Sequence, residues 1–461
     1  MSGKAKTPGK GISSELIIII ILAAVTILTW IVPAGEFLRD ESNMVISGSY
    51  QSVASSPVGP WGLLLAIYDG FVDGGSIIFF LMFSAAYVNL LIKINAFHAS
   101  VGALLRIMGD KDILIIPVFF TLFSIAGATI GLGQATYALV PVFVALCIAL
   151  GYDRLVGTSI VLVGAGVGFA SALTNPSTVV IASDIAGIPL MTPGFLAFRI
   201  TALVIFTAAS IIYVTRYAIR IRKNPELSYE YGYEQTDANA LSRDEIAKME
   251  FTGLQKISML GFLVIMVAVI WGSIQFSWGM RELSALFLLA LIITAVINHM
   301  GVTDIFDIFI DASKSMMRPA VIIALARAIS AVMTAGHIID TVVNVMGITL
   351  NSLPPALAPI GMLCVQTLIN FFISSGSGQA VAVMPIMAPL SDLVNLPRIV
   401  AVTAYQYGDG FSNFVWPTGC APQVAVTGTG FNRWYKFMGP WYLLMFVLQC
   451  VLVTASALLF S

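Results

Sequence analysis

Apolar runs long enough to cross a membrane dominate the pattern of hydrophobic and polar positions. A helix needs about 20 apolar residues to span the hydrocarbon core of a bilayer. Runs of this kind lie at residues 16–33, 61–92, 196–217, 257–276, 283–299, 317–335 and 437–460. We predict one membrane helix in each run, so that lipid surrounds most of the chain.

Two further regions, 112–193 and 355–432, are apolar but are repeatedly interrupted by Gly, Pro, Ser, Thr and Asn. Backbone that leaves the helical conformation at membrane depth is tolerated only where it is buried in protein or lines a water-filled cavity. Function is therefore expected in these two regions. We predict a re-entrant hairpin followed by a broken helix in each, over residues 112–150, 154–192, 355–395 and 398–430.

The two interrupted regions carry the same markers in the same order. Gly-Gln-Ala is followed by Pro, Arg, a Gly-Phe pair, Pro with a hydroxyl residue and a final Gly, starting at Gly133 in one region and at Gly378 in the other. The interval from the first Pro to Arg is 13 residues in both, and the interval from the second Pro to the final Gly is 11 in both. The chain thus contains an internal duplication, which is typical of transporter folds.

Charge predicts the orientation of these repeats. The polar segment 218–256 separates a first repeat, 1–217, from a second repeat, 257–461, and basic residues at its edge place it in the cytoplasm. Three lysines before the first apolar run place the N-terminus there as well. The second hairpin then enters from the opposite face, so the repeats are inverted and the C-terminus is outside. Three acidic residues of the linker are expected to be solvated: Glu226, Glu230 and Glu234.

Composition agrees with a membrane protein and argues against an enzyme. Of 461 residues, 58% are hydrophobic and 10% are charged, whereas soluble proteins carry about 25% charged residues. The net charge of -1 gives no sign of a nucleic-acid partner. Four cysteines and three histidines are scattered without metal-ligand spacing, and no hydrolase motif occurs. We predict no catalytic residue and no resident cofactor.

Four motifs meet at membrane depth in this scheme: GLGQAT, TNPST, SSGSGQ and GDGFSNFVWPTG. Half-helix N-termini present free N–H groups to a substrate carboxylate, and unwound carbonyls with Asn, Ser and Thr oxygens can coordinate Na⁺. Small-residue helix packing is the alternative for each motif alone. The substrate-contact candidates are Gly133, Gln134, Thr136, Asn175, Ser177, Ser375, Ser377, Gln379, Asn413 and Thr418. A Na⁺ ion is expected near Asn175 and Asn413.

Two charges lie inside apolar segments. Asp409 follows Gly408 in the second broken helix, and Arg327 lies midway through the run at 317–335. Ionisable groups within a membrane are costly and usually functional. We predict that Asp409, with Thr178 and Asn370, couples an ion (Na⁺ or H⁺) or meets a substrate ammonium. Arg327 is expected either to neutralise Asp409 or to meet a substrate carboxylate, and simple pairing of the two charges is the structural alternative.

Three segments carry a family resemblance: TWIVPAGEF (29–37), INFFISSGSGQAVAVMPIMAPL (369–390) and YQYGDGFSNFVWPT (405–418). They resemble the YfcC-type proposed amino-acid antiporters, which belong with the C4-dicarboxylate anaerobic carriers and the arginine/ornithine antiporters in the ion transporter superfamily. The resemblance implies an elevator-type carrier of carboxylate-bearing metabolites, often a homodimer. The family's first hairpin usually has an acidic pair where this chain has Gln134 and Ala135, which favours a zwitterionic or anionic substrate over arginine or ornithine.

The sequence therefore predicts an all-α polytopic protein of two inverted repeats in the inner membrane. Its expected function is secondary transport of a small amino acid or carboxylate by alternating access. A C4-dicarboxylate or other short-chain carboxylate carrier is the alternative substrate class. A passive channel is the alternative mechanism, although a channel needs a continuous polar pore rather than one polar cluster at mid-depth.

Overall fold

The computed structural model describes residues 14–41, 45–46, 48–232, 249–276, 278–351, 353–354 and 356–460. Within these ranges the protein is nearly all helical, as predicted, and the exceptions are the paired two-residue strands β1 (Gly35–Glu36) and β2 (Gln51–Ser52). The predicted cytoplasmic N-terminus, residues 233–248 of the predicted linker (with Glu234) and the C-terminal residue lie outside the described ranges.

The described helices lie in two halves, before and after residues 233–248 of the predicted linker. The first half contains α1 (Ser14–Ile31), α2 (Pro60–Lys93), α3 (Ala96–Met108), η1 (Gly109–Leu114), α4 (Ile115–Ile130), η2 (Gln134–Leu139), α5 (Val140–Ala149), α6 (Arg154–Thr158), η3 (Ser159–Val163), α7 (Gly164–Ser171), α8 (Val179–Ile185), α9 (Pro193–Lys223) and η4 (Pro225–Leu227). The second half contains α11 (Gly253–Phe276), α12 (Met280–Ile297), α13 (Val302–Ala335), α14 (Ile339–Asn351), α15 (Ala358–Phe372), α16 (Gly376–Leu393), α17 (Arg398–Ser412), α18 (Pro417–Thr427) and α19 (Phe431–Phe460).

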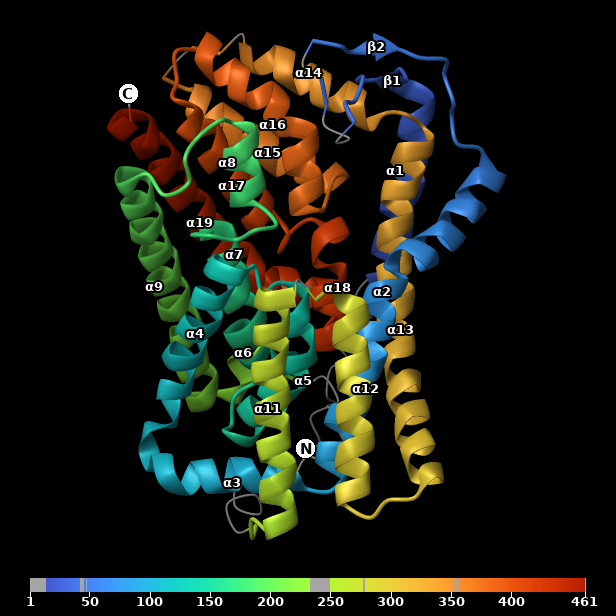
Figure 1. The fold of residues 1–461 in the computed structure, drawn as a ribbon, viewed down its shortest axis with the longest axis vertical. Helices are drawn as coiled ribbons and strands as arrows, with labels where there is room; N and C mark the ends of the chain where they lie inside the picture. The colour runs from blue at the N-terminus through green and yellow to red at the C-terminus, as the bar shows by residue number, and fades with distance from the viewer. Residues whose placement is uncertain are drawn as a thin grey trace, which may run out of the picture.

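Helices α1, α2, α12 and α13 lie towards one side of the molecule in Figure 1, and α11 packs on α12 nearer the middle of the view; we call these five helices the frame. Helices α2 and α13, each 34 residues long, pack along one another, and α1 and α12 pack against them. Gly70 permits this close crossing, because a Cβ atom there would lie 2.2 Å from the carbonyl oxygen of Ala324. Large apolar side chains on α11, such as Leu260 and Val267, are exposed and suit a lipid environment.

The remaining long helices form a core body, in which α4 packs on α7 and α15 packs on α17. Figure 1 shows the α15–α16 pair descending from the end that carries α14, whereas α4 rises from the end that carries α3. Seven helices of the described part are long and apolar enough to cross a membrane. The protein is therefore a multi-pass membrane protein, with the interrupted segments at the centre of the core body.

Several helix bounds differ from the prediction; α19, for example, begins at Phe431 rather than at residue 437. The run at 317–335 is the second half of α13, which starts at Val302; the earlier part was missed because it carries four charged residues, namely Asp304, Asp307, Asp311 and Lys314. The short helices α3 and α14, 13 residues each, were not predicted, because such lengths give no membrane-spanning signal. Helix α9 also continues six residues into the predicted linker, to Lys223.

The beginning of the linker is docked on the core body rather than solvated. Ser228 donates a hydrogen bond to Asp153 at 2.7 Å, and Tyr217 donates to the same carboxylate at 2.5 Å. Glu230 is 8% exposed, so the prediction that it is solvated is wrong, whereas Glu226 is exposed. Burial raises the pKa of the Glu230 carboxyl above its ordinary value, and the nearby Asp153 raises it further.

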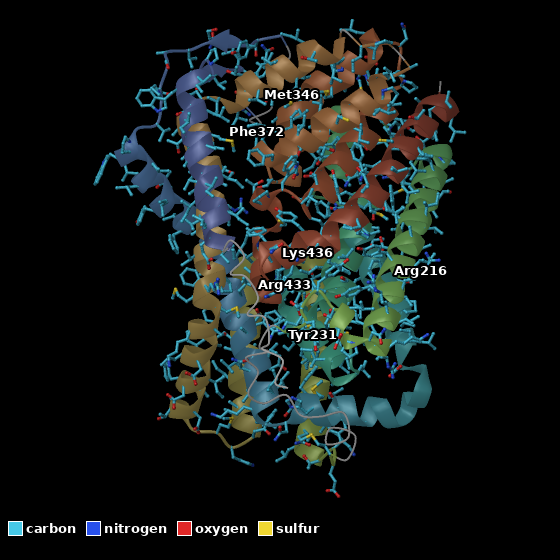
Figure 2. The ribbon with its side chains drawn as sticks, turned by 180° about the vertical axis from the view of Figure 1, so that it is seen from behind. Arg216, Tyr231, Met346, Phe372, Arg433 and Lys436 are labelled. Carbon is cyan, nitrogen blue, oxygen red and sulfur yellow. The ribbon has the colours of Figure 1, made fainter. Side chains whose placement is uncertain are left out.

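Three basic residues on two helices lie near the middle height of the molecule. Figure 2 shows Arg216 on α9 and Arg433 and Lys436 at the start of α19 at this level, with Phe372 and Met346 towards one end and Tyr231 towards the other.

Candidate functional site

Each half of the core body has one helix pair with a non-helical tip and one interrupted helix. In the second half the tip joins α15 to α16, and Ser375 caps α16 by accepting a hydrogen bond from the Gly378 N–H at 3.3 Å. The interruption lies between Ser412 and Pro417, where proline starts α18 because it has no N–H to donate. Pro and Gly therefore set both departures from helix locally.

The second half places one carboxylate in a buried amide network. Asp409 is fully buried, and its Oδ1 accepts a hydrogen bond from Asn370 Nδ2 at 2.7 Å. The same Asn370 amide approaches Gln379 Oε1 at 3.2 Å, and Gln379 Nε2 donates to Gln366 Oε1 at 2.8 Å. Asn413 Nδ2 donates to the Asp409 backbone oxygen at 2.9 Å. Helices α15, α16 and α17 thus converge on one carboxylate through neutral amides.

Several oxygens in this network and on the neighbouring Thr178 of the first half have no hydrogen-bond partner among the described residues. They are Asp409 Oδ2, Asn370 Oδ1 and Thr178 Oγ1, and all three side chains are fully buried. Buried polar groups normally have a partner, and an unpaired acceptor in a low-dielectric site is costly. A hard cation such as Na⁺ takes oxygen ligands, so this set of atoms fits a cation or a proton better than an anion.

The first half has its own tip and interruption, and they touch each other. Gly131 has a φ of +67°, and a Cβ atom there would lie 2.4 Å from Asn175 Oδ1, so only glycine fits. Asn175 is fully buried and its Oδ1 accepts from the Ser177 N–H at 2.9 Å, while its Nδ2 has no partner among the described residues. Thr174 donates to the Thr129 carbonyl at 2.9 Å and fastens the interruption to α4.

The two halves meet at Gly376, the first residue of α16. A Cβ atom there would lie 2.6 Å from Thr178 Cγ2 and 3.0 Å from Asp409 Oδ2. It would also lie 3.3 Å from the ring of Phe169, at the end of α7. The interruption of the first half therefore reaches the carboxylate of the second half.

The two interrupted helices also contact one another at their outer ends, in a reciprocal way. Arg398, which starts α17, donates to the Ala186 carbonyl at 3.0 Å, next to Gly187 at the end of α8. Arg154, which starts α6, has its NH1 3.0 Å from a Cβ atom built on Gly428 at the end of α18. Each arginine thus lies at the C-terminal end of the other interrupted helix, where a cation stabilises the helix dipole.

The structure gathers most predicted site residues around the tips and interruptions. Asp409, Asn370, Gln379 and Thr178 share the cluster described above. The side chains of Ser177, Ser375 and Ser377 are exposed beside it, and Thr418 donates to the Phe371 carbonyl at 3.0 Å. In the first tip, Thr136 donates to the carbonyl of Gly133 at 2.6 Å. Gln134 starts η2, and its side chain lies outside the described part.

Arg327 is the exception. Its NH1 lies 3.4 Å from Asp73 Oδ2 on α2, so the carboxylate beside it belongs to the frame rather than to Asp409. The expected neutralisation of Asp409 by Arg327 is therefore wrong, and the Asp409 carboxylate accepts a hydrogen bond from the neutral Asn370 amide instead. Asp73 was not singled out from the sequence, because partners on different helices leave no spacing signal.

Sequence reasoning also missed the donors and acceptors that support the cluster from behind. Gln406 Nε2 donates to the Phe169 carbonyl at 2.7 Å, and Tyr405 donates to the Gly376 carbonyl at 2.6 Å. At the second interruption, Trp434 donates to the Phe414 carbonyl at 2.8 Å and Tyr435 to the Val415 carbonyl at 2.8 Å. In the sequence these four residues are visible only as polar side chains within apolar helices, and that feature alone does not distinguish a packing role from a functional one.

The fold and the site define a polytopic membrane transport protein, because a closed polar cluster between interrupted helices at the centre of a lipid-embedded body suits a translocated solute. Among the described residues, no three His, Cys, Asp or Glu side chains are placed to hold a metal ion together. The family model of the C4-dicarboxylate anaerobic carriers, DcuC, matches residues 13–457. The chain belongs to this family.

Two relatives match nearly the whole chain. YfcC of Escherichia coli strain K12, a proposed basic amino acid antiporter, is 30% identical over 96% of this chain and 96% of its own length. An uncharacterized protein of Haemophilus influenzae is 29% identical over 90% of this chain and 81% of its own length. The YdaH transporter of Alcanivorax borkumensis aligns over 96% of this chain and 98% of its own, with 15% identity and a TM-score of 0.44. That last similarity is too low to support an inference.

Proposed function

We propose that this protein is a secondary carrier that moves a small amino acid or carboxylate across the inner membrane. Transport is coupled to a cation or occurs as exchange. The observation that carries the proposal is the buried carboxylate of Asp409, whose Oδ2 has no partner among the described residues. The side chains of Asn370, which donates to Oδ1, and of Thr178, whose methyl group lies near Gly376 as Asp409 Oδ2 does, each carry a further unpaired oxygen. Such a site is stable only when a cation or proton occupies it for part of the cycle.

We further propose inverted repeats and an elevator-type motion. Support comes from matched elements: α2 and α13 have 34 residues each, α3 and α14 have 13 each, and α9 and α19 have 31 and 30. The reciprocal contacts of Arg154 and Arg398 add a second match. A frame packed around α2 and α13, which meets the core body chiefly where α13 packs on α18, gives the two parts that such a motion needs.

The inverted orientation is tested by labelling single cysteines at exposed positions. Tyr231→Cys and Leu459→Cys should react with membrane-impermeant maleimide from opposite sides of the membrane. Labelling of both from one side contradicts the inverted repeats. The homodimer that the family implies is a separate expectation, which mass measurement of the purified carrier in lipid nanodiscs checks.

For the substrate, we propose a zwitterionic or anionic carboxylate compound. The tips and interruptions offer neutral donors, including the unpaired Asn175 Nδ2 and the exposed hydroxyls of Ser177 and Ser375. Helices α16 and α18 also begin beside the cluster, and their free N–H groups favour an anionic group. A C4-dicarboxylate remains the second candidate, because the family description names that class.

Counterflow in proteoliposomes tests the carrier. A carrier is accelerated by unlabelled substrate on the opposite side, whereas a channel is not. The substrate is first found by a thermal-shift screen of amino acids and C4-dicarboxylates with and without Na⁺, because a ligand stabilises the folded state by mass action. Flux without trans-stimulation contradicts the proposal.

A further inference from the structure

Arg199 of α9 is a buried guanidinium that neither the sequence motifs nor the proposed transport step accounts for. It is 4% exposed, in a helix long and apolar enough to span the membrane. Its NH1 donates to the Ala172 carbonyl at 3.2 Å, and its NH2 donates to the Leu190 carbonyl at 2.8 Å. A buried charge is retained only where specific contacts offset its desolvation, so these contacts need an explanation.

The two carbonyls bracket the interruption of the first half. Ala172 is the first residue after α7, and Leu190 follows α8, so the segment between them contains Asn175 and Thr178. The guanidinium joins both ends of this segment with one rigid fork, which a point-like ammonium cannot do. It also lies at the C-terminal end of α7, where backbone carbonyls carry partial negative charge.

The surroundings hold the fork in place. The guanidinium carbon lies 4.5 Å from the centre of the Phe195 ring, a favourable cation–π contact. A small cavity behind it is lined by Arg199, Gln406 and Tyr407 among others, and Arg199 Nε, Gln406 Oε1 and Tyr407 OH have no partner among the described residues. One water molecule satisfies such a set of two donors and one acceptor.

The last turn of α7, which ends just before Ala172, also reaches the candidate site. Gln406 holds the Phe169 carbonyl from behind, while the Phe169 ring reaches Gly376 beside Asp409. We propose that Arg199 is the positioning residue of the first interruption: it fixes residues 172–190 so that Thr178 stays against Gly376 and Asp409. The role in ion binding rests on the proposed function, whereas the positioning role does not.

Hydrogen–deuterium exchange on the full-length protein tests the positioning directly. Arg199→Met keeps the length and removes all donors. It should raise the exchange rates of the Ala182, Ala186 and Ile188 amides at least tenfold and leave α17 unchanged. Trp434→Phe, which removes one donor from the second interruption, should leave these three amides unchanged. Equal loss of protection throughout the core body, or no change at the three amides, overturns the proposal.

Na⁺ is the probe for the functional consequence. Arg199→Met should raise the NaCl concentration for half-maximal thermal stabilisation about tenfold, with choline chloride as the reference. Arg199→Lys, which keeps the charge but not the fork, should raise the same NaCl concentration about threefold. This variant tests the role of Arg199 in ion binding if Arg199→Met does not fold. Phe437→Leu, at a buried ring packed on Tyr213 and Tyr217, should lower the melting temperature without changing this concentration. An unchanged Na⁺ response in both arginine variants overturns the role of Arg199 in ion binding. A wild type without any Na⁺ response contradicts the proposed Na⁺ coupling; the positioning role is then decided by the hydrogen–deuterium exchange experiment alone.

Discussion

Replacement of Asp409 by asparagine is the sharpest test of the candidate site. The two side chains have nearly the same shape, so Asp409→Asn opens no cavity and keeps an oxygen for the Asn370 amide, which donates to Oδ1 at 2.7 Å. The substitution removes one negative charge from a fully buried position. Its effect therefore reports on that charge rather than on packing.

The expected magnitude follows from the contacts. An ion taken out of water costs several kcal/mol after relaxation, and one hydrogen bond to a charged group returns about 1.5–3 kcal/mol. The carboxylate has one such bond through Oδ1 and an unpaired Oδ2 among the described residues. Without a bound cation, we expect Asp409→Asn to be more stable than the wild type by about 1–3 kcal/mol. A cation present at 100 times its dissociation constant raises the free energy of unfolding of the wild type by about 2.7 kcal/mol and leaves that of the variant unchanged.

Thermal unfolding in lipid or detergent, with NaCl exchanged for choline chloride at constant ionic strength, measures both effects. The wild type should unfold at a lower temperature than Asp409→Asn in choline chloride and should gain stability in NaCl, while the variant does not respond. A wild type that responds to pH but not to Na⁺ assigns a proton to the site instead. A variant that is destabilised in choline chloride and still responds to Na⁺ refutes the cation site at Asp409.

Three further predictions test other parts of the structure. Asn175→Ala and Asn413→Ala should each reduce transport at least tenfold in proteoliposomes. The free energy of unfolding should change by no more than about 1–2 kcal/mol, because each substitution removes few hydrogen bonds. Normal transport by both variants means that the site lies elsewhere. Gly131→Ala should destabilise the protein by about 1–2 kcal/mol and impair transport, because its φ is +67° and a Cβ atom would meet an amide oxygen. Gly261→Ala, at a position of α11 where an added Cβ atom has open space, should resemble the wild type in both assays. Glu230→Gln should be more stable than the wild type at pH 8 and should lose this advantage towards pH 4. The reason is that the raised pKa of the Glu230 carboxyl stabilises the wild type at low pH, and this stability is lost as the pH rises through the folded-state pKa. A difference in melting temperature that does not vary with pH contradicts this prediction.

The sequence determined which parts of the chain are regular and which are interrupted. Apolar runs predicted α1, α2, α9, α11, α12 and α19, because a helix in lipid must satisfy its own backbone and needs a fixed number of apolar residues. The interruptions at Pro176 and Pro417 were visible for the same local reason, since proline cannot continue a helix. Asp409 stood out because a charge in an apolar run is rare.

Only the tertiary structure decided which side chains meet. Asp409 is joined to Asn370 and brought near Thr178, while Arg327 lies beside Asp73 on another helix. Contacts between distant elements depend on how helices cross, and spacing along the chain does not encode this. Burial is decided in the same way: Glu230 was predicted to be solvated and Arg199 was not singled out from the sequence, yet packing of α9 and the following segment against the interrupted helices buries both.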